Sequence, residues 1–310
     1  MSQRARSHVV LAEEVRDALL RGRPVVALET AIVTHGLPDD GGIAAMTTAA
    51  EEVRGAGAIP ASIAVLEGQI RVGLSSTDFE LLTNAVPHRV AARDLAAAVT
   101  NRWTASMTVS ASLGVARLAG IHTLATATVG GVQRGSAVLD ISSDIAELAA
   151  SPVCLVTSGL APMIDVPRTL ELLETAGVPL VGYQTDRLPL FYVADSPYRV
   201  TSTAADAGAV ADLCQIHWDL GRRTAVVVAH PPAPEAALDA ADVDRWVTSA
   251  LERAAAAGVR GGALTPFVTD AMHEASDGQT GRAYRDVLIA NARLAGLIEA
   301  KRPTLRNWRR

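Results

Sequence analysis

Lysine is almost absent from this chain of 310 residues. Of its 28 lysine and arginine residues, only Lys301 is a lysine. Arginine stays protonated at any accessible pH and cannot form an imine with a carbonyl compound. Chemistry that needs a Schiff-base lysine in the body of the protein is therefore excluded, unless the C-terminal tail folds back onto it.

Cysteine, aromatic residues and long apolar runs are also scarce. The two cysteines are too few for a disulfide framework, and Cys154 lies in an apolar run typical of a buried strand. No run approaches the ~20 apolar residues of a membrane span, and the polar N-terminus lacks the apolar core of a signal peptide. Aromatic residues make up 4% of the chain, too few for stacking platforms that bind nucleic acid. The one basic block, residues 301–310, is interpreted as a solvated tail. We therefore expect a cytoplasmic protein that binds neither nucleic acid nor a membrane.

Strand-like and helix-like segments alternate along the chain, which predicts an α/β layered sheet in a single domain spanning residues 1–310. Short apolar runs predict strands over 25–28, 63–66, 69–72, 123–126, 153–156, 179–181 and 225–229. Residues 88–94 are typical of a strand followed by a turn. Apolar residues at helical spacing predict helices over 9–20, 43–54, 76–82, 104–118, 167–175, 242–257, 265–275 and 284–299.

The stretch from Val25 to Pro38 is the first candidate for a functional site. It begins as an apolar strand and becomes polar at Glu29. Ligands of open α/β sheets bind outside the carboxyl ends of the strands. We therefore predict that Glu29 faces a crevice; a carboxylate that only caps the next turn is the alternative.

Three further segments carry residue types that suit a phosphorylated ligand. The Ser/Thr-rich start of the predicted helix 104–118, which includes Thr108, would present hydroxyls and backbone N–H groups to a phosphate, with an ordinary N-cap as the alternative. Glycines in the loop 128–135 would let the backbone approach a ligand closely. The segment Asp140-Ile-Ser-Ser-Asp144 places two carboxylates four residues apart, which suits a hard metal or a phosphate as well as a helix cap.

A series of motifs runs in order from about residue 10 to 300. It includes Pro24-Val-Val-Ala-Leu-Glu-Thr30, Ile63-Ala-Val-Leu-Glu-Gly-Gln-Ile-Arg-Val-Gly-Leu74, Gly130-Gly-Val-Gln-Arg-Gly135, Asp140-Ile-Ser-Ser-Asp144, Thr265-Pro-Phe267 and Asn291-Ala292. Together these motifs resemble the pseudouridine-5'-phosphate glycosidase family, far more specifically than any one of them alone.

The resemblance implies an α/β/α sandwich, a homotrimer and a divalent metal, manganese or alternatively magnesium. Family members split the C–C bond between C1 of ribose 5-phosphate and C5 of uracil, and a lysine holds C1 of the opened sugar as an imine. Carried over by motif, Glu29 is the acid/base and Asp140 holds the metal through its solvent shell. The residues implied to line the sugar phosphate are Val109, through its backbone, with Ser142, Ser143 and Asp144.

The chain departs from the family pattern at the positions of the lysines and of the base. The imine lysine's position falls on Ala161, and the second lysine's position falls on Arg89, with His88 as the alternative. Gln133 stands where the family usually has histidine, and Tyr284 where it usually has asparagine. The chain therefore matches the family in the half of the site that binds the sugar phosphate and the metal, but not in the half that forms the imine and faces the base.

These departures change the expected reaction. Cleavage of the C–C bond needs an electron sink at C1, which the imine would supply. Ring-opened ribose 5-phosphate already carries an electrophilic aldehyde. We therefore predict a C-glycosynthase that joins C1 of ribose 5-phosphate to an aromatic, polyketide-like acceptor, similar to C-ribosylating members of this family in polyketide biosynthesis. Glu29 would move protons, Arg89 would stabilise oxyanion charge and Tyr284 would face the acceptor. A glycosidase that works without the imine and an inactive sugar-phosphate-binding protein are the alternatives.

Overall fold

The computed structural model describes residues 8–34, 37, 41–84, 88–135 and 140–302. Within these residues, eleven strands form one sheet. The strands are β1 Val9–Leu11, β2 Val25–Leu28, β3 Ile59–Leu66, β4 Gln69–Val72, β5 His88–Val90, β6 Ala105–Met107, β7 Thr123–Ala125, β8 Cys154–Thr157, β9 Leu180–Tyr183, β10 Ser202–Ala204 and β11 Val226–Ala229.

Helices connect and cover these strands. They are α2 Glu13–Leu20, α3 Ala31–Thr34, α4 Gly41–Gly55, α5 Ser76–Asn84, α6 Leu95–Thr100, α7 Val109–Ala119, α8 Asp144–Ala150, α9 Val166–Ala176, α10 Ala207–Asp219, α11 Ala240–Ala256, α12 Leu264–Ala275 and α13 Gln279–Lys301, with short 3-10 turns η1 Ala92–Asp94 and η2 Gly261–Ala263.

The strands run in the order β1-β4-β3-β2-β7-β8-β11-β9-β10, and β6 pairs with β3 and β5. From β3 to β10 every neighbouring pair is parallel. The second half of β3 leaves this parallel sheet and pairs antiparallel with β4 and β6. The carboxyl ends of β2, β7, β8 and β11 therefore lie side by side at one edge, where ligands of such sheets bind.

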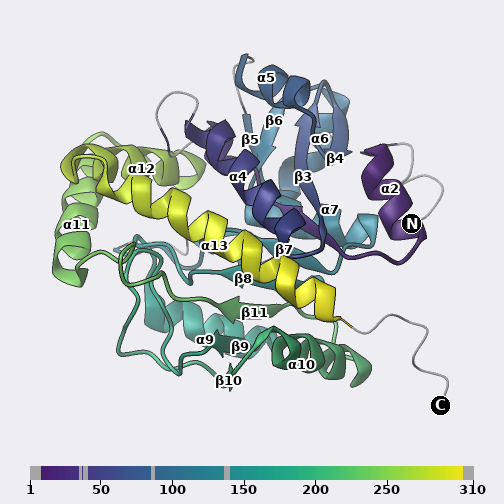
Figure 1. Ribbon diagram of the computed structural model, residues 1–310. Coiled ribbons are helices and arrows are strands. Elements are labelled where there is room, and N and C mark those ends of the chain that lie inside the picture. Colours follow the sequence, from purple (N-terminus) through teal and green to yellow (C-terminus); the bar gives the residue numbers. More distant parts are fainter. Residues whose placement is uncertain (1–7, 35–36, 38–40, 85–87, 136–139, 303–310) are drawn as a thin grey trace.

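Helices cover both faces of the parallel sheet, as a sheet with two buried faces requires. The long helix α13 crosses one face next to α4 and α10, while α7, α8 and α9 pack on the other face (Figure 1). Helices α11 and α12 lie together at one side of the molecule. This arrangement confirms the predicted α/β class with helices on both sides of a layered sheet.

Two predicted helices were wrong at their starts. Residues 9–11 form β1, which pairs with β4, and residues 105–107 form β6, which pairs with β3 and β5. In both places a strand of three residues owes its existence to partners far away in the sequence. The remaining predicted strands and helices are present, with their ends shifted by at most five residues, whereas α3, α6, α8, α10 and β10 were not predicted.

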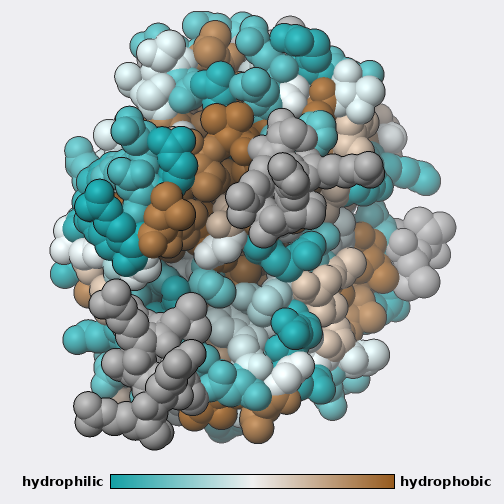
Figure 2. Space-filling view, turned by 90° about the vertical axis from the view of Figure 1, so that its right-hand side faces the viewer, coloured by the Kyte–Doolittle hydropathy of each residue, from teal (hydrophilic) through white to brown (hydrophobic). Residues whose placement is uncertain are grey.

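Exposed apolar side chains are few in the part of the chain that the structure describes. The most exposed are Leu20 of α2 (79%) and Leu220 just after α10 (77%). The side of the molecule on which these helices lie shows apolar areas interrupted by hydrophilic ones (Figure 2). No helix among the described residues combines the length and apolar character that crossing a membrane requires.

Candidate active site

A cavity of about 410 Å³ lies beyond the carboxyl ends of β2 and β7. All eleven residues predicted from the sequence line it, namely Glu29, Arg89, Thr108, Val109, Gln133, Asp140, Ser142, Ser143, Asp144, Ala161 and Tyr284. His88, the alternative to Arg89, is exposed, and its ring stacks on Trp103 with centroids 4.5 Å apart. Adjacent residues of a strand point to opposite faces, so Arg89 is the one that reaches the cavity.

Glu29 is buried, with 8% of its surface exposed, at the end of β2. The hydroxyl of Thr126 donates a hydrogen bond to its carboxylate. The pKa of Glu29 is raised to about 7 chiefly by burial, with a smaller contribution from the charge of Asp144, and against the lowering effects of the bond from Thr126 and the charge of Arg89. A carboxyl group with a pKa near neutrality can both give and take a proton at physiological pH.

The sheet register explains why Thr126 meets Glu29. Leu28 of β2 pairs with Ala125 of β7 in the parallel ladder. Glu29 and Thr126 are the next residues of these two strands, so they leave the sheet side by side. The acid and its hydrogen-bond donor are therefore placed by strand pairing, although 97 residues separate them in the sequence.

Asp144 holds two loops of the cavity together with its carboxylate. One oxygen accepts the backbone N–H of Ser110, and the other accepts the backbone N–H of Gly130, both at 2.9 Å. A Cβ at Gly130 would lie 2.6 Å from the Ser142 hydroxyl and 3.0 Å from Asp144. The glycine-rich loop can approach α8 this closely only because residue 130 has no side chain.

A chain of hydroxyl groups borders the same part of the cavity. Ser110 lies 2.9 Å from both Thr108 and Ser143, oxygen to oxygen, and it accepts the backbone N–H of Ala92. Thr108 and Ser143 stand at the N-cap positions of α7 and α8, but neither side chain makes a capping hydrogen bond. Helix N-termini and hydroxyls together form a polar wall suited to an anion such as a phosphate.

The donor set at Asp140 suits a hard divalent cation only in combination with water or a ligand. Among the described residues, no group of three His, Cys, Asp or Glu side chains could hold a metal. Asp140 lines the cavity beside Ser142, while both oxygens of Asp144 already accept backbone N–H groups. Magnesium-like cations are typically bound by one or two carboxylates together with water and substrate phosphate. These residues fit that arrangement rather than a cage of protein ligands.

Part of the cavity lining is aromatic. Tyr284 of α13 meets Phe191 edge to face, with ring centroids 5.3 Å apart, and Phe191 stacks on Tyr192. Burial, followed by the charge of Glu29, raises the pKa of Tyr284, against the opposing charge of Arg89. The buried side-chain oxygen of Gln133 has no hydrogen-bond partner. The cavity therefore offers aromatic rings against which a flat ligand can pack, and in Gln133 an acceptor for a hydrogen bond from a ligand.

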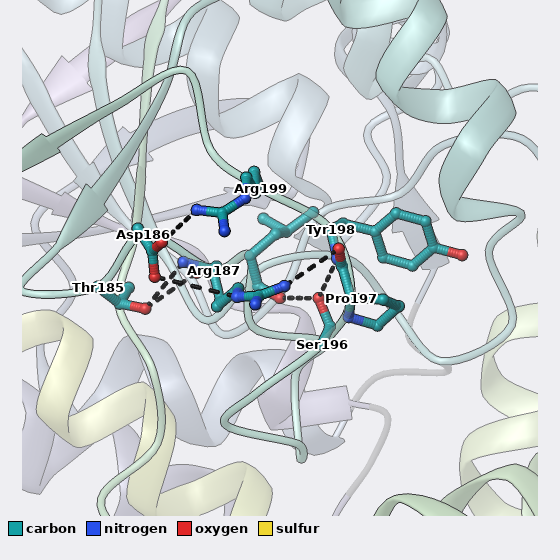
Figure 3. Close-up of polar contacts among 8 residues, drawn as sticks. Thr185, Asp186, Arg187, Ser196, Pro197, Tyr198 and Arg199 are labelled. Atoms are coloured by element: carbon teal, nitrogen blue, oxygen red, sulfur yellow. Dashed lines mark hydrogen bonds and ion pairs between the residues drawn. The ribbon is translucent and has the colours of Figure 1, made fainter.

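The loop between β9 and β10 carries Phe191 and Tyr192 to the cavity. Its base is closed by Asp186, which forms ion pairs with Arg187 and Arg199 (Figure 3). Further along, Ser196 donates a hydrogen bond of 2.6 Å to the carbonyl of Leu188. These contacts fix the shape of a loop that contains little regular structure.

The loop also packs tightly on the end of β8 at Gly159. A Cβ at this position would lie 1.8 Å from the Pro189 carbonyl oxygen, and the residue has a φ of +91°. Only glycine combines that conformation with such a close approach.

No lysine of the described chain reaches the cavity. Ala161, at the position that the resemblance assigns to the imine lysine, lines the wall. Lys301 is exposed at the last turn of α13, 17 residues beyond Tyr284 and therefore about 25 Å further along the helix axis. A fold-back of this lysine into the cavity does not occur, so the site contains arginine as its basic residue and no side-chain amine.

Several residues of the site were missed from the sequence. One is Thr126, a buried threonine; another is Ser110, a serine within a helix; and a third is Phe191, an aromatic residue in a long loop. None of them belongs to a recognisable motif. Arg93 also lines the cavity, with a side chain that is 79% exposed. Only Thr126 offered a signal, because this last residue of the predicted strand 123–126 is polar, as is Glu29 directly after β2.

Comparison with known proteins gives consistent matches over almost the whole chain. The model of the family described as indigoidine synthase A like protein matches residues 14–301. A pseudouridine-5'-phosphate glycosidase of Myxococcus xanthus is 40% identical, with 93% of this chain and 96% of that protein covered. One of Caldanaerobacter subterraneus subsp. tengcongensis is 38% identical, with 93% and 94% covered. The crystal structure of the prealnumycin C-glycosynthase AlnA in complex with ribulose 5-phosphate superposes with a TM-score of 0.85 at 33% identity, covering 94% of this chain and 96% of that one.

Proposed function

This chain belongs to the indigoidine synthase A like protein family, and from the chemistry of its cavity we propose that it is a C-glycosynthase. The substrates are ribose 5-phosphate and an electron-rich aromatic compound. The observation that carries the proposal is an acid/base of nearly neutral pKa, Glu29, beside an arginine in a cavity that holds no lysine. The similarity to AlnA and to relatives named pseudouridine-5'-phosphate glycosidase supports chemistry at a C-glycosidic bond.

The sugar binds in its open form, with the phosphate against the hydroxyl wall. The N-termini of α7 and α8 and the side chains of Ser142 and Ser143 face the phosphate. Arg93 at the rim of the cavity adds positive charge. A divalent metal, manganese or magnesium, held at Asp140 would neutralise the phosphate when bound. This half of the site anchors the substrate and leaves the aldehyde C1 directed toward Glu29.

Bond formation requires polarisation of the aldehyde and two proton transfers. A carbon of the acceptor attacks C1, and the carbonyl electron pair moves to oxygen, where Arg89 stabilises the developing negative charge. Glu29 in its acid form protonates this oxygen, and its carboxylate then removes the proton from the attacked acceptor carbon. Glu29, again in its acid form, protonates the C1 hydroxyl, which leaves as water, and the C4 hydroxyl attacks C1 to close the ring while its proton returns to Glu29. The sum is ribose 5-phosphate plus acceptor giving C-riboside 5-phosphate plus water.

The direct test is product formation with purified protein. Incubation with ribose 5-phosphate, Mn²⁺ and electron-rich phenols or naphthols should give a product heavier than the acceptor by one ribose phosphate less one water. Glu29→Gln should bind ribose 5-phosphate and form no product. Rapid release of uracil from pseudouridine 5'-phosphate, with no ribosylated product from any acceptor, would contradict the synthase proposal.

That contrary outcome defines the second candidate, a pseudouridine-5'-phosphate glycosidase that works without an imine. The names of the two relatives at 38–40% identity favour it. An inactive sugar-phosphate-binding protein would instead keep its affinity in Glu29→Gln and have no activity to lose.

The proposal extends to the assembly and to the role of the protein. A homotrimer of the 32.3 kDa chain is expected, and light scattering in solution measures it. A polyketide-like acceptor would place the enzyme in secondary metabolism, and screening of aromatic acceptors tests this.

A further inference from the structure

Four neighbouring strands are followed by polar residues, and the first two of these residues line the cavity. Glu29, Thr126, Ser158 and His230 are the first residues after β2, β7, β8 and β11. These strands are adjacent and parallel, so the four residues lie in a row. Behind this row runs α13, which contributes the fully buried Asn291.

Asn291 connects three of these strand ends through its side-chain amide. The amide nitrogen donates to the carbonyl of Thr126 at 2.9 Å and to the hydroxyl of Ser158 at 3.2 Å. The amide oxygen lies 2.9 Å from Nδ1 of His230 and 3.4 Å from the Ser158 hydroxyl. Both donors and both lone pairs of the amide are thereby used. A side chain that only filled space in the core would not need this full set.

The carbonyl of Thr126, which can only accept, determines which way the amide of Asn291 points. Burial lowers the pKa of His230, which keeps the ring neutral near pH 7, and the edge of Tyr183 packs against it with centroids 5.5 Å apart. The reversed amide orientation would set the amide oxygen against the Thr126 carbonyl oxygen. The amide oxygen therefore faces Nδ1 of His230, so in the neutral ring that nitrogen carries the proton and donates to it.

We infer that Asn291, supported by His230, is a positioning residue that holds Thr126 so that its hydroxyl donates to Glu29 and favours the ionised acid. The backbone carbonyl of Thr126 accepts the hydrogen bond from Asn291, while its side-chain hydroxyl donates to Glu29. The role of Glu29 in turnover rests on the proposed function, whereas its hydrogen bond does not.

The other charged and titratable groups that face Glu29 stay in place when Asn291 or His230 is substituted. They are Arg89 of β5, Asp144 of α8 and Tyr284 of α13, all on the cavity side. Asn291 lies behind the strand ends and touches none of them in its hydrogen bonds. Substitutions there therefore act on Glu29 through Thr126.

The experiment measures the ionisation of Glu29 by ¹³C NMR of protein labelled at the glutamate carboxyl carbon, with the signal assigned by its loss in Glu29→Gln. Thr126→Val and Asn291→Leu should each raise the titration midpoint of Glu29 by about one pH unit, the effect of losing one hydrogen bond to a charged group. The double variant should shift it no further than Thr126→Val alone. If Asn291→Leu does not fold, His230→Phe should shift the midpoint in the same direction.

Thr123→Val is the matched control. Thr123 is also a buried threonine of β7 whose hydroxyl binds α13, at Glu299, 2.7 Å away at the other end of the strand. This control should lose stability and leave the Glu29 titration unchanged. An unshifted midpoint in Asn291→Leu, additive shifts in the double variant, or an equal shift in Thr123→Val would overturn the inference. The titration needs no turnover, so a failure of the proposed function is seen separately.

Discussion

Replacement of Glu29 by glutamine should make the protein more stable at high pH. The pKa of Glu29 is about 7 in the folded protein against an ordinary value of 4.5. The folded state therefore holds a proton that the unfolded state releases between these values, and stability falls as the pH rises through this window. Glutamine resembles the protonated acid at every pH, so it avoids the cost of a buried charge.

The size of the effect follows from the two pKa values. The raised pKa costs the wild-type protein about 3 kcal/mol at pH 8 and less than about 1 kcal/mol at pH 5. The stability of Glu29→Gln relative to wild type should therefore increase by about 2 to 3 kcal/mol from pH 5 to pH 8. Taking this difference between two pH values removes any change in packing or hydrogen bonding that does not depend on pH.

Urea unfolding followed by tryptophan fluorescence, at one protein concentration and several pH values, measures this difference. Glu235→Gln is the control, because Glu235 is exposed and its substitution should give the same relative stability at all pH values. If Glu29→Gln gains nothing over wild type between pH 5 and pH 8, the carboxyl group is not held in a desolvated site. The assignment of Glu29 as an acid/base of nearly neutral pKa would then be wrong.

Four further variants probe other parts of the site. Ala161→Lys introduces an amine at the cavity wall. With ribose 5-phosphate and borohydride this variant should form a covalent adduct that mass spectrometry detects, and wild type should form none. An unmodified variant would show that residue 161 lies away from C1. Asp144→Asn should lower the free energy of unfolding by about 1 to 3 kcal/mol, because the amide replaces an acceptor of two backbone N–H groups. Asp140→Asn should change the free energy of unfolding by no more than about 0.5 kcal/mol. In calorimetry, it should abolish the effect of Mn²⁺ on ribose 5-phosphate binding. Equal losses of stability in Asp144→Asn and Asp140→Asn would contradict these separate roles. Gly130→Ala should weaken ribose 5-phosphate binding more than tenfold because its Cβ has no room, whereas Gly55→Ala, with nothing within 4 Å, should bind as wild type does.

Motifs and local patterns predicted a large part of the site. The apolar run that ends at Glu29 marked the carboxyl end of a buried strand, and that edge is where the cavity lies. The family resemblance supplied Asp140, Ser142 and Asp144, which stand within five residues of one another and so form a recognisable motif. Ala161 and Tyr284 were identified as departures from that resemblance, and the structure brings both to the cavity.

Contacts between distant segments could not be predicted in the same way. Thr126 reaches Glu29 across 97 residues, and Asn291 reaches Thr126 across 165. The strands β1 and β6 were predicted as helices because three-residue strands carry almost no periodic signal of their own. Their partners decide their conformation, and no local window contains those partners.

Taken alone, the order of amino acids established an α/β chain with one lysine, two scattered cysteines and a carboxylate following a buried strand. These properties are local or compositional, so they can be counted along the chain. The side-by-side arrangement of Glu29 and Thr126, the raised pKa and the choice of Arg89 over His88 depend instead on strand register and burial. Such properties exist only once the sheet has brought distant strands together and excluded water from between them.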